Sequence, residues 1–420
     1  MGGQGWAVRT TEYLINRGGL ISTFKWDIAS HKIEAGAWFE NDWATQNRVW
    51  YPFAASSNDL TPYEIPKNQA FTQYQFHSQN RDLVTHIQDQ WQVESNMTVQ
   101  YGFKSSFQFA EGKFPINQQN AATNTNPTQY PSGSLNTREW FLPELGLVYD
   151  FDAQDHGFIN IQSNMRHFAD YGAGGSAWSQ ASQAAFNLFK DTVKPESSTT
   201  YETGLRSQHS LDWGLISGFE GQASLYHVDF HDRQLQISST PVIGSLVAGA
   251  TIITNVGSVK TDGADIAGTL HFGSHFSFYN ALSYNHSVYQ ENYNTGANNS
   301  LVMTAGKIVP GDPEWMNKSV LSAHYGVVEG ELSGDYVGKR FATYTNDLWV
   351  KSYYMTNLHL GYSLPSFNGF ALKSMKLNLN VTNLGNIKGT STLVVAAASG
   401  AYNTYPIPPR MIFINFASKF

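Results

Sequence analysis

The sequence of 420 residues contains no cysteine, which excludes disulfides, thiolate metal sites and cysteine nucleophiles. Charged residues are scarce as well, at 14% of the chain against roughly 25% in an average soluble domain. The net charge of −7 is mild, and no basic stretch indicates nucleic-acid binding. The composition therefore argues against an ordinary soluble protein and against a nucleic-acid partner.

Long apolar runs and an export signal are also missing. No stretch of about 18 apolar residues occurs, which excludes a transmembrane helix. The amino terminus, from Met1 through Trp6, has no basic region, no apolar region and no cleavage site, so it is not a signal peptide. Because an exported protein needs such a signal, we expect this chain to be a fragment or part of a split gene.

Known catalytic motifs are missing too. The sequence has no G-x-S-x-G, no H-E-x-x-H and no phosphate-binding loop. Asp150, Asp152 and Asp155 surround a predicted turn, where solvated carboxylates are more ordinary than a catalytic pair. We therefore expect no enzyme, no catalytic residue and no cofactor.

Aromatic residues are abundant, at 14% of the chain, and many recur at every second position. One face of the segment 98–109 carries Val99, Tyr101, Phe103, Phe107 and Phe109, and the other carries Gln100, Gly102, Lys104, Ser106 and Gln108. Strand side chains alternate between two sides, so such a segment has one apolar and one polar face. A sheet that shows lipid one apolar side chain in two keeps the mean hydropathy low, here −0.33.

The same alternation predicts about fifteen strands, each long enough to cross a bilayer when tilted. They lie near 18–28, 31–44, 82–94, 96–110, 138–151, 155–168, 198–213, 217–234, 257–273, 275–288, 314–327, 329–342, 348–363, 374–384 and 409–420. Their connections alternate between short and long, apart from a short one near 343–347. Short periplasmic turns opposite long external loops are typical of outer-membrane barrels. We therefore predict an all-β fold, a transmembrane antiparallel β-barrel in the bacterial outer membrane.

Several short motifs carry a family resemblance. In order along the chain they are Phe141-Leu142-Pro143-Glu144-Leu145-Gly146, Lys194-Pro195-Glu196 with Tyr201–Arg206, Asn255-Val256-Gly257 with Gly263-Ala264-Asp265, Gly306–Pro313, Asn380–Asn386, Pro406–Arg410 and the terminal Phe420. Taken together, they resemble the barrel of TonB-dependent receptors, in particular siderophore receptors. Asp265, Gly385 and Ser418 depart from the usual residues of that pattern.

The resemblance implies a receptor barrel of about 22 strands with a plugged lumen. Residues 1–420 would form one partial barrel domain holding the last fifteen or so strands, whereas the plug, the TonB-binding segment and the first strands have no counterpart. The implied function is TonB-dependent uptake of a scarce ligand, most simply a ferric siderophore, with vitamin B12, sugars and other metal chelates as open alternatives. The implied partners are that ligand, outer-membrane lipid, and TonB only through a plug that this sequence does not contain.

Three alternatives stay open. A passive porin needs no plug, and a split receptor gene could leave a non-functional fragment. An outer-membrane enzyme is the third alternative, although no motif supports it. Within the family that the motifs resemble, the motif residues serve mainly to build turns and strand ends rather than to contact a ligand, because Gly, Pro and Asn favour such positions.

Aromatic residues on the long connections are the candidate ligand contacts, because rings bury much area at low entropic cost. The predicted contacts are Tyr63, Tyr74, His77, Trp178 and Tyr402. Aromatic residues in these segments also suit the girdle at the lipid interface, and Trp43 and Trp50 fit that role better.

A group of polar residues within the strand near 217–234 is the candidate for a metal site. His227, Asp229 and His231 alternate with apolar residues and share one side of the strand, which we expect to be the lumen side. Ligands in a row along one strand rarely converge on a metal. We therefore predict a polar lumen face here and no metal site.

Overall fold

The structure is a computed structural model of the chain, and it describes residues 7–52, 71–118, 130–168, 176–180, 182–238, 251–294, 301–364, 374–395 and 403–419. No helix among these residues is long and apolar enough to cross a membrane.

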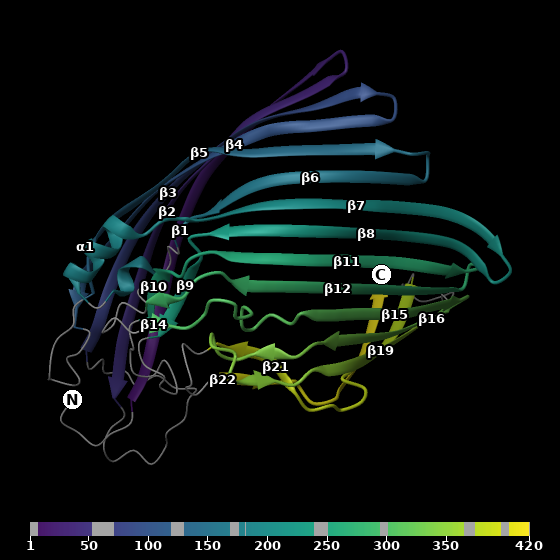
Figure 1. The fold of residues 1–420 in the computed structure, drawn as a ribbon. Coiled ribbons are helices and arrows are strands. Elements are labelled where there is room, and N and C mark those ends of the chain that lie inside the picture. The colour runs from purple at the N-terminus through teal and green to yellow at the C-terminus, as the bar shows by residue number, and fades with distance from the viewer. Residues whose placement is uncertain are drawn as a thin grey trace.

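A single antiparallel sheet of 15 strands forms the body of the molecule, with neighbouring strands in sequence order (Figure 1). Its strands are β1 (Ala7–Ile28), β2 (His31–Pro52), β3 (Phe71–Glu94), β4 (Met97–Asn117), β5 (Gly133–Asp150), β6 (Asp155–Arg166), β7 (Glu196–Trp213), β8 (Ile216–His231), β11 (Val259–Phe272), β12 (Phe276–Tyr289), β15 (Trp315–Tyr325), β16 (Val328–Val337), β19 (Tyr353–Leu364), β20 (Ser374–Thr382) and β23 (Met411–Lys419). The all-β antiparallel fold and every predicted strand are therefore confirmed.

The ends of the sheet are open. Within the described residues, β1 pairs only with β2 and β23 only with β20, so the sheet curves without closing. Figure 1 shows the first strands, in purple and blue, crossing the later ones at a steep angle.

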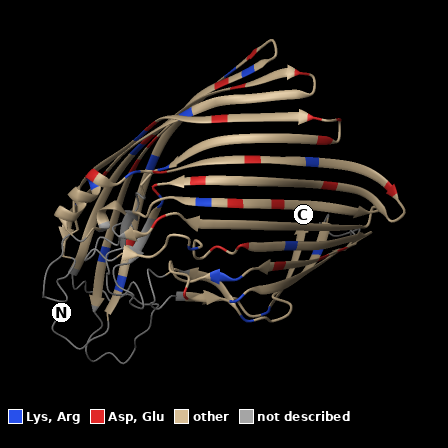
Figure 2. Cartoon of the chain, viewed as in Figure 1, with Lys and Arg blue, Asp and Glu red and all other residues tan. Residues whose placement is uncertain are grey.

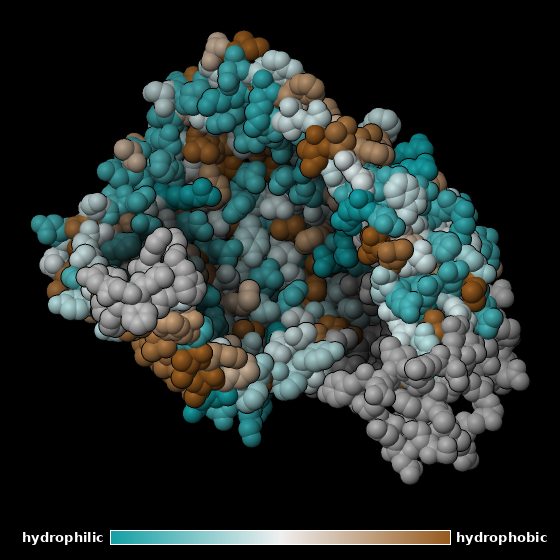
Figure 3. Space-filling view, turned by 180° about the vertical axis from the view of Figure 1, so that it is seen from behind, coloured by the Kyte–Doolittle hydropathy of each residue, from teal (hydrophilic) through white to brown (hydrophobic). Residues whose placement is uncertain are grey.

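The two faces of the sheet differ in polarity, as the alternation predicts. Leu205, Leu225 and Ile266 lie on one face and are each more than half exposed. We call this the apolar face. The opposite, polar face carries side chains such as Lys104 and Glu202. Figure 3 looks into a hollow whose wall is largely hydrophilic, and Figure 2 shows charges of both signs interspersed along the strands. The apolar face suits lipid and the polar face suits a wet interior.

Tight turns join the strands at one end of the sheet, which we call the short-turn end. The hairpins β1–β2, β7–β8 and β15–β16 turn through Ala29, Gly214 and Gly326, with φ values of 52°, 62° and 59°. Such turns need positive φ because only then does the turn match the twist of the two strands. Glycine adopts that conformation without a Cβ penalty, which explains its place at two of these turns.

The opposite, long-loop end contains structure that the alternation did not predict. Four short hairpins lie there: β9 (Gln234–Ser238) with β10 (Thr251–Asn255), β13 (Tyr293–Asn294) with β14 (Leu301–Val302), β17 (Arg340–Phe341) with β18 (Trp349–Val350), and β21 (Thr390–Val394) with β22 (Asn403–Pro406). A turn of 3₁₀ helix, η1 (Ala177–Ser179), and a helix, α1 (Gln183–Thr192), lie within the connection expected as loop near 169–197. Ser182 caps α1 by accepting a hydrogen bond from the Ala185 amide at 3.1 Å.

Candidate functional site: the long-loop end and the polar face

A buried aromatic cluster holds the long-loop end of β3, β4 and β5 together. We call it the first rim cluster, and its members are Tyr74, Phe76, Ala110, Tyr130, Leu135, Phe168, Ala177, Trp178, Phe186 and Phe189. The Phe76 and Trp178 rings are 5.8 Å apart, and the Tyr74 and Tyr130 rings meet edge to face at 5.6 Å. Because Phe186 and Phe189 come from α1, the cluster fixes the helix against the strands.

Trp178 is the centre of this packing. Its indole Nε1 donates a hydrogen bond to the Gly133 carbonyl at 3.0 Å. A Cβ on Gly112 would lie 2.5 Å from the indole, so this position needs glycine for the ring to approach the backbone of β4. The ring therefore serves as the main apolar anchor of the connection between β6 and β7.

Two of the five predicted ligand contacts meet in this cluster. Tyr74 and Trp178 both have 0% exposure. The Tyr74 hydroxyl accepts a hydrogen bond from Gln46 Nε2 at 3.0 Å, and burial raises its pKa above the ordinary value. Either ring would reach a ligand only if the cluster opened, and their role in ligand binding stays a prediction.

Of the other three predicted contacts, only His77 belongs to the described residues, and it does not join this cluster. His77 lies on β3 and is exposed, on the face opposite Tyr74 and Phe76. Tyr63 and Tyr402 lie outside the described residues. Ligand contact at these three positions also stays a prediction.

Farther along the sheet, motif residues tie the rim together through hydrogen bonds. The buried carboxylate of Glu196, at the start of β7, accepts from Arg233 Nη1 at 3.2 Å and from the Gln234 amide at 2.8 Å. Asn255 Nδ2 donates to the carbonyls of Lys194 (3.0 Å) and Asp232 (2.6 Å). The Lys194-Pro195-Glu196 motif and the Asn255-Val256-Gly257 motif therefore form one latch between β7, β8 and β11.

A second latch closes the turn after β20. Asn383 has φ 50° and is 2% exposed. Its side chain donates to the carbonyls of Ile387 (3.0 Å) and Pro408 (2.9 Å), and accepts from the Ile387 amide at 2.8 Å. Asn386 Oδ1 accepts from the Arg410 amide at 3.0 Å. The expectation that motif residues build turns and strand ends is confirmed at these positions.

A second buried cluster lies beneath the first latch. We call it the second rim cluster, and its members are Val256, Val259, Tyr289, Tyr293, Val302, Val309 and Tyr344. The Tyr344 ring meets Tyr289 at 6.2 Å and Tyr293 at 6.0 Å, both edge to face. Burial raises the pKa of Tyr344 to about 12, so its phenol stays neutral. Val256, from the Asn255-Val256-Gly257 motif, packs inside this cluster at 1% exposure.

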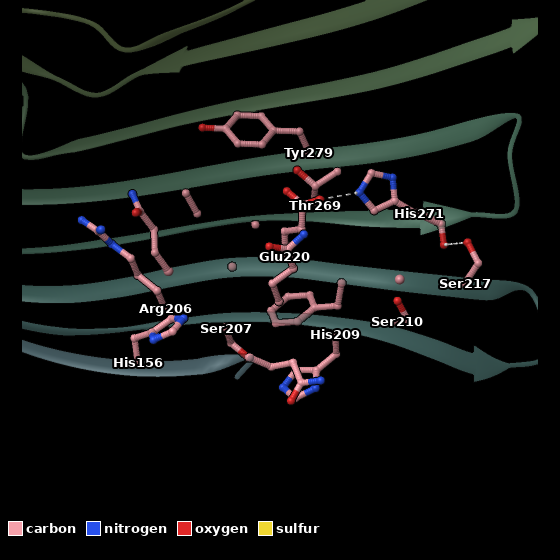
Figure 4. A pocket seen from close by; sticks show the side chains of 18 of the residues that line it. His156, Arg206, Ser207, His209, Ser210, Ser217, Glu220, Thr269, His271 and Tyr279 are labelled. Atoms are coloured by element: carbon pink, nitrogen blue, oxygen red, sulfur yellow. Dashed lines mark hydrogen bonds and ion pairs between the residues drawn. The ribbon is translucent and has the colours of Figure 1, made fainter. Parts of the chain in front are cut away.

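A hollow of the polar face lies near the short-turn end. It is an open groove of about 930 Å³ lined by His156, Arg206, Glu220, Thr269, His271 and Tyr279 (Figure 4). His271 Nε2 lies 3.4 Å from Glu220 Oε1. The groove is polar and carries both charges, so it suits contact with water or a polar protein surface better than an apolar ligand.

The expected side of His227, Asp229 and His231 is wrong. The three residues lie on the same face of β8 as Leu225, which is the apolar face. His227 Nδ1 lies 2.7 Å from Asp262 Oδ1, and its Nε2 lies 3.3 Å from Asp229 Oδ1. The described residues hold no group of three ligands placed for a metal.

This architecture matches known proteins. The family model described as TonB dependent receptor-like, beta-barrel, matches residues 4–384. A crystal structure of the ferric yersiniabactin uptake receptor FyuA from Yersinia pestis matches at TM-score 0.69 and 15% identity, covering 99% of this chain and 56% of that one. The ferric citrate transporter FecA matches at TM-score 0.66 and 15% identity, over 100% and 56% of the two chains.

The copper transporter OprC matches at TM-score 0.62 and 14% identity, over 98% of this chain and 57% of its own. No curated protein sequence matches. The chain thus spans little more than half the length of these solved structures, and at this identity they show the fold alone. Because the family model covers most of the sequence, this chain belongs to the TonB-dependent receptor-like β-barrels.

Proposed function

We propose that this chain forms the barrel wall of a bacterial outer-membrane receptor for TonB-dependent uptake of a scarce ligand, a ferric siderophore or similar metal chelate. Residues 1–420 would be one partial domain of a barrel of about 22 strands. Energy from TonB would reach the ligand through a plug that these residues do not include.

The observation that carries the proposal is that the two faces and the two ends of one sheet differ in character. The apolar face suits lipid, the polar face surrounds a wet interior, and all the long connections of the described sheet gather at one end. Structures with this fold include receptors named for ferric yersiniabactin and ferric citrate. The arrangement supports ligand capture at the long-loop end and passage along the polar face.

The two rim clusters and the latches would hold the capturing connections in place. His77 is exposed and is a proposed ligand contact that needs no opening of the first rim cluster. Tyr63 and Tyr402 are proposed as ligand contacts as well. Tyr74 and Trp178 would contact a ligand only after the first rim cluster opens, because both rings are buried in it.

The test is uptake in the source bacterium. A strain deleted for this coding region should lose saturable uptake of one ⁵⁵Fe-labelled chelate, and the intact locus should restore it. Restoration should fail when TonB is deleted. Uptake of small sugars that is independent of TonB and does not saturate would instead establish a passive pore and overturn the proposal.

A further inference from the structure

On the apolar face, two arginines lie beside β4, where its row of aromatic side chains ends toward the long-loop end. Arg81 on β3 pairs in register with Phe109, and Arg138 on β5 pairs with Phe107. The two arginines therefore flank β4, roughly 12 Å apart at their Cα atoms by the ordinary spacing of strands. Long side chains at this separation can reach a common ligand.

The ring surface beside these arginines is unusually exposed because of a β-bulge. The register of β4 and β5 shifts between Lys104 and Ser106, and Ser105 Oγ donates to the Trp140 carbonyl at 2.7 Å. As a result, the adjacent residues Trp140 and Phe141 both contact rings of the apolar face, Phe107 at 4.7 Å and Phe103 at 5.2 Å. Trp140 is 69% exposed, and bulges often re-aim side chains at functional positions.

Arg81 is held in place rather than free to turn away. Its guanidinium lies over the Phe109 ring at 5.6 Å. With its amide oriented to satisfy its neighbours, Gln79 accepts from Arg81 Nη2 at 3.2 Å and from Trp43 Nε1 at 3.1 Å. The cation therefore lies at a fixed position on the apolar face.

The charge at this place is unbalanced. No ion pair among the described residues involves Arg81 or Arg138, and the nearby Glu111 pairs with Lys113 at 2.9 Å. At a comparable boundary of β8 and β11, Lys260 lies 3.5 Å from Asp229 and is neutralised. Arg81 lies over the Phe109 ring and Arg138 lies beside Phe107 in register, so two cations without an ion pair among the described residues flank exposed rings. This arrangement complements an anionic headgroup whose chains lie along those rings.

We propose that Arg81, Arg138 and Trp140 bind a phosphorylated glycolipid of the outer leaflet, with its phosphates on the arginines and its acyl chains along Trp140 and Phe141. This inference rests on the outer-membrane location proposed above, but not on the identity of the transported ligand. Arginine suits the site because its planar donor fork binds phosphate in two-point contacts.

The test uses the full chain in detergent and native mass spectrometry with purified diphosphoryl lipid A. The double variant Arg81→Gln/Arg138→Gln should bind at least about tenfold more weakly than wild type, since each cation near a membrane surface adds roughly a factor of five. The matched control is Lys260→Gln, which removes a neutralised cation from the same face and should leave binding unchanged.

Two further arms distinguish the lipid from simpler explanations. Inorganic phosphate at millimolar concentration should not displace the lipid, and dephosphorylated lipid should bind wild type no better than it binds the double variant. Equal lipid binding by the double variant and wild type would overturn the proposal, as would displacement by phosphate. Because binding is measured without transport, a failure here is distinct from a failure of the uptake experiment.

Discussion

The long-loop end is built in two ways, by apolar packing around β3–β5 and by side-chain hydrogen bonds around β20. Around β3–β5 the strands are long, with 24 residues in β3, and the rim is held by the first rim cluster. Around β20 the strand has 9 residues, and the rim is held by the Asn383 latch. Apolar packing accepts many residue types of suitable volume, whereas a side chain that bonds three backbone groups does not. The motifs Asn380–Asn386 and Pro406–Arg410 both lie in the region that the Asn383 latch holds.

The largest expected effect is the loss of Trp178. Trp178→Ala should lower the free energy of opening the β3–β5 rim by about 3–5 kcal/mol, because a fully buried indole leaves a cavity. Trp178→Phe should cost far less, because packing tolerates another ring. Hydrogen exchange of rim amides in the full chain would measure both. Equal losses for the two variants would contradict a packed, substitution-tolerant rim.

The turn after β20, which the Asn383 latch holds, should lose stability even in a conservative substitution, unlike the first rim cluster. Asn383→Asp removes the donor to Ile387 and Pro408, and Asn383→Ala removes every side-chain bond. Both should lower the free energy of local opening, by roughly 1–3 kcal/mol for each buried partner left unsatisfied. Hydrogen exchange at 383–389 reports the change. Asn378→Ala, which loses one exposed bond to Asn415, is the control and should have little effect there.

A smaller effect is expected for Ala substitutions at two glycines with positive φ, Gly257 and Gly306, which separate the cost of backbone strain from the cost of a steric contact. Gly257 has φ 86°, and a Cβ there would lie 2.3 Å from Glu291 Oε2, whereas Gly306 has φ 74° and nothing within 4 Å of its Cβ position. Each change to Ala should cost about 1–2 kcal/mol from the left-handed conformation alone. Gly257→Ala should cost more by the displacement of Glu291. Thermal unfolding would compare the stability that the two variants lose. A larger loss in Gly306→Ala than in Gly257→Ala would contradict the proposed contact between the new Cβ and Glu291.

The smallest effect is a dependence on pH at the turn between β17 and β18. Hydrogen bonds from Thr343 and Thr345 lower the pKa of the Asp347 carboxyl below its usual value. Because the pKa of Asp347 is lower in the folded turn than in the unfolded chain, its carboxylate stabilises the turn fully above the unfolded-state pKa of about 3.9. This stability is lost as pH falls through the lowered folded-state pKa. The protection of the 343–348 amides, taken relative to intrinsic exchange at each pH, should therefore fall below that range. In Asp347→Asn this pH dependence of the protection should vanish, and its persistence would assign the effect to another group.

The sequence predicts the strands well for a physical reason. A strand in a bilayer must alternate apolar and polar side chains, so crossings such as 96–110 can be recognised from local order alone. The same reasoning fails beyond the lipid. The first strand begins at Ala7 rather than near 18, and β3 begins at Phe71 rather than near 82, because strand ends outside the membrane need no alternation.

The sites were harder to predict. The alternation correctly places His227 and Asp229 on one side of their strand but gives the wrong side, because beyond the apolar band both faces meet polar surroundings. The helix α1 carries only two buried residues in ten, which is too weak a signal beside the polar residues of its connection. The sequence indicates Tyr74 and Trp178 as aromatic residues of the long connections, but no local pattern predicts that they share a cluster.

By itself, the sequence determined the strands and the alternation of polarity between their two faces, since each depends on neighbours within a few residues. Only the tertiary structure decided what lies inside the rim. Phe76 meets Trp178, and Asn383 reaches Pro408, across connections whose path no local pattern specifies. Contacts between residues far apart in sequence depend on the curvature and register of the whole sheet, and these exist only once the strands have paired.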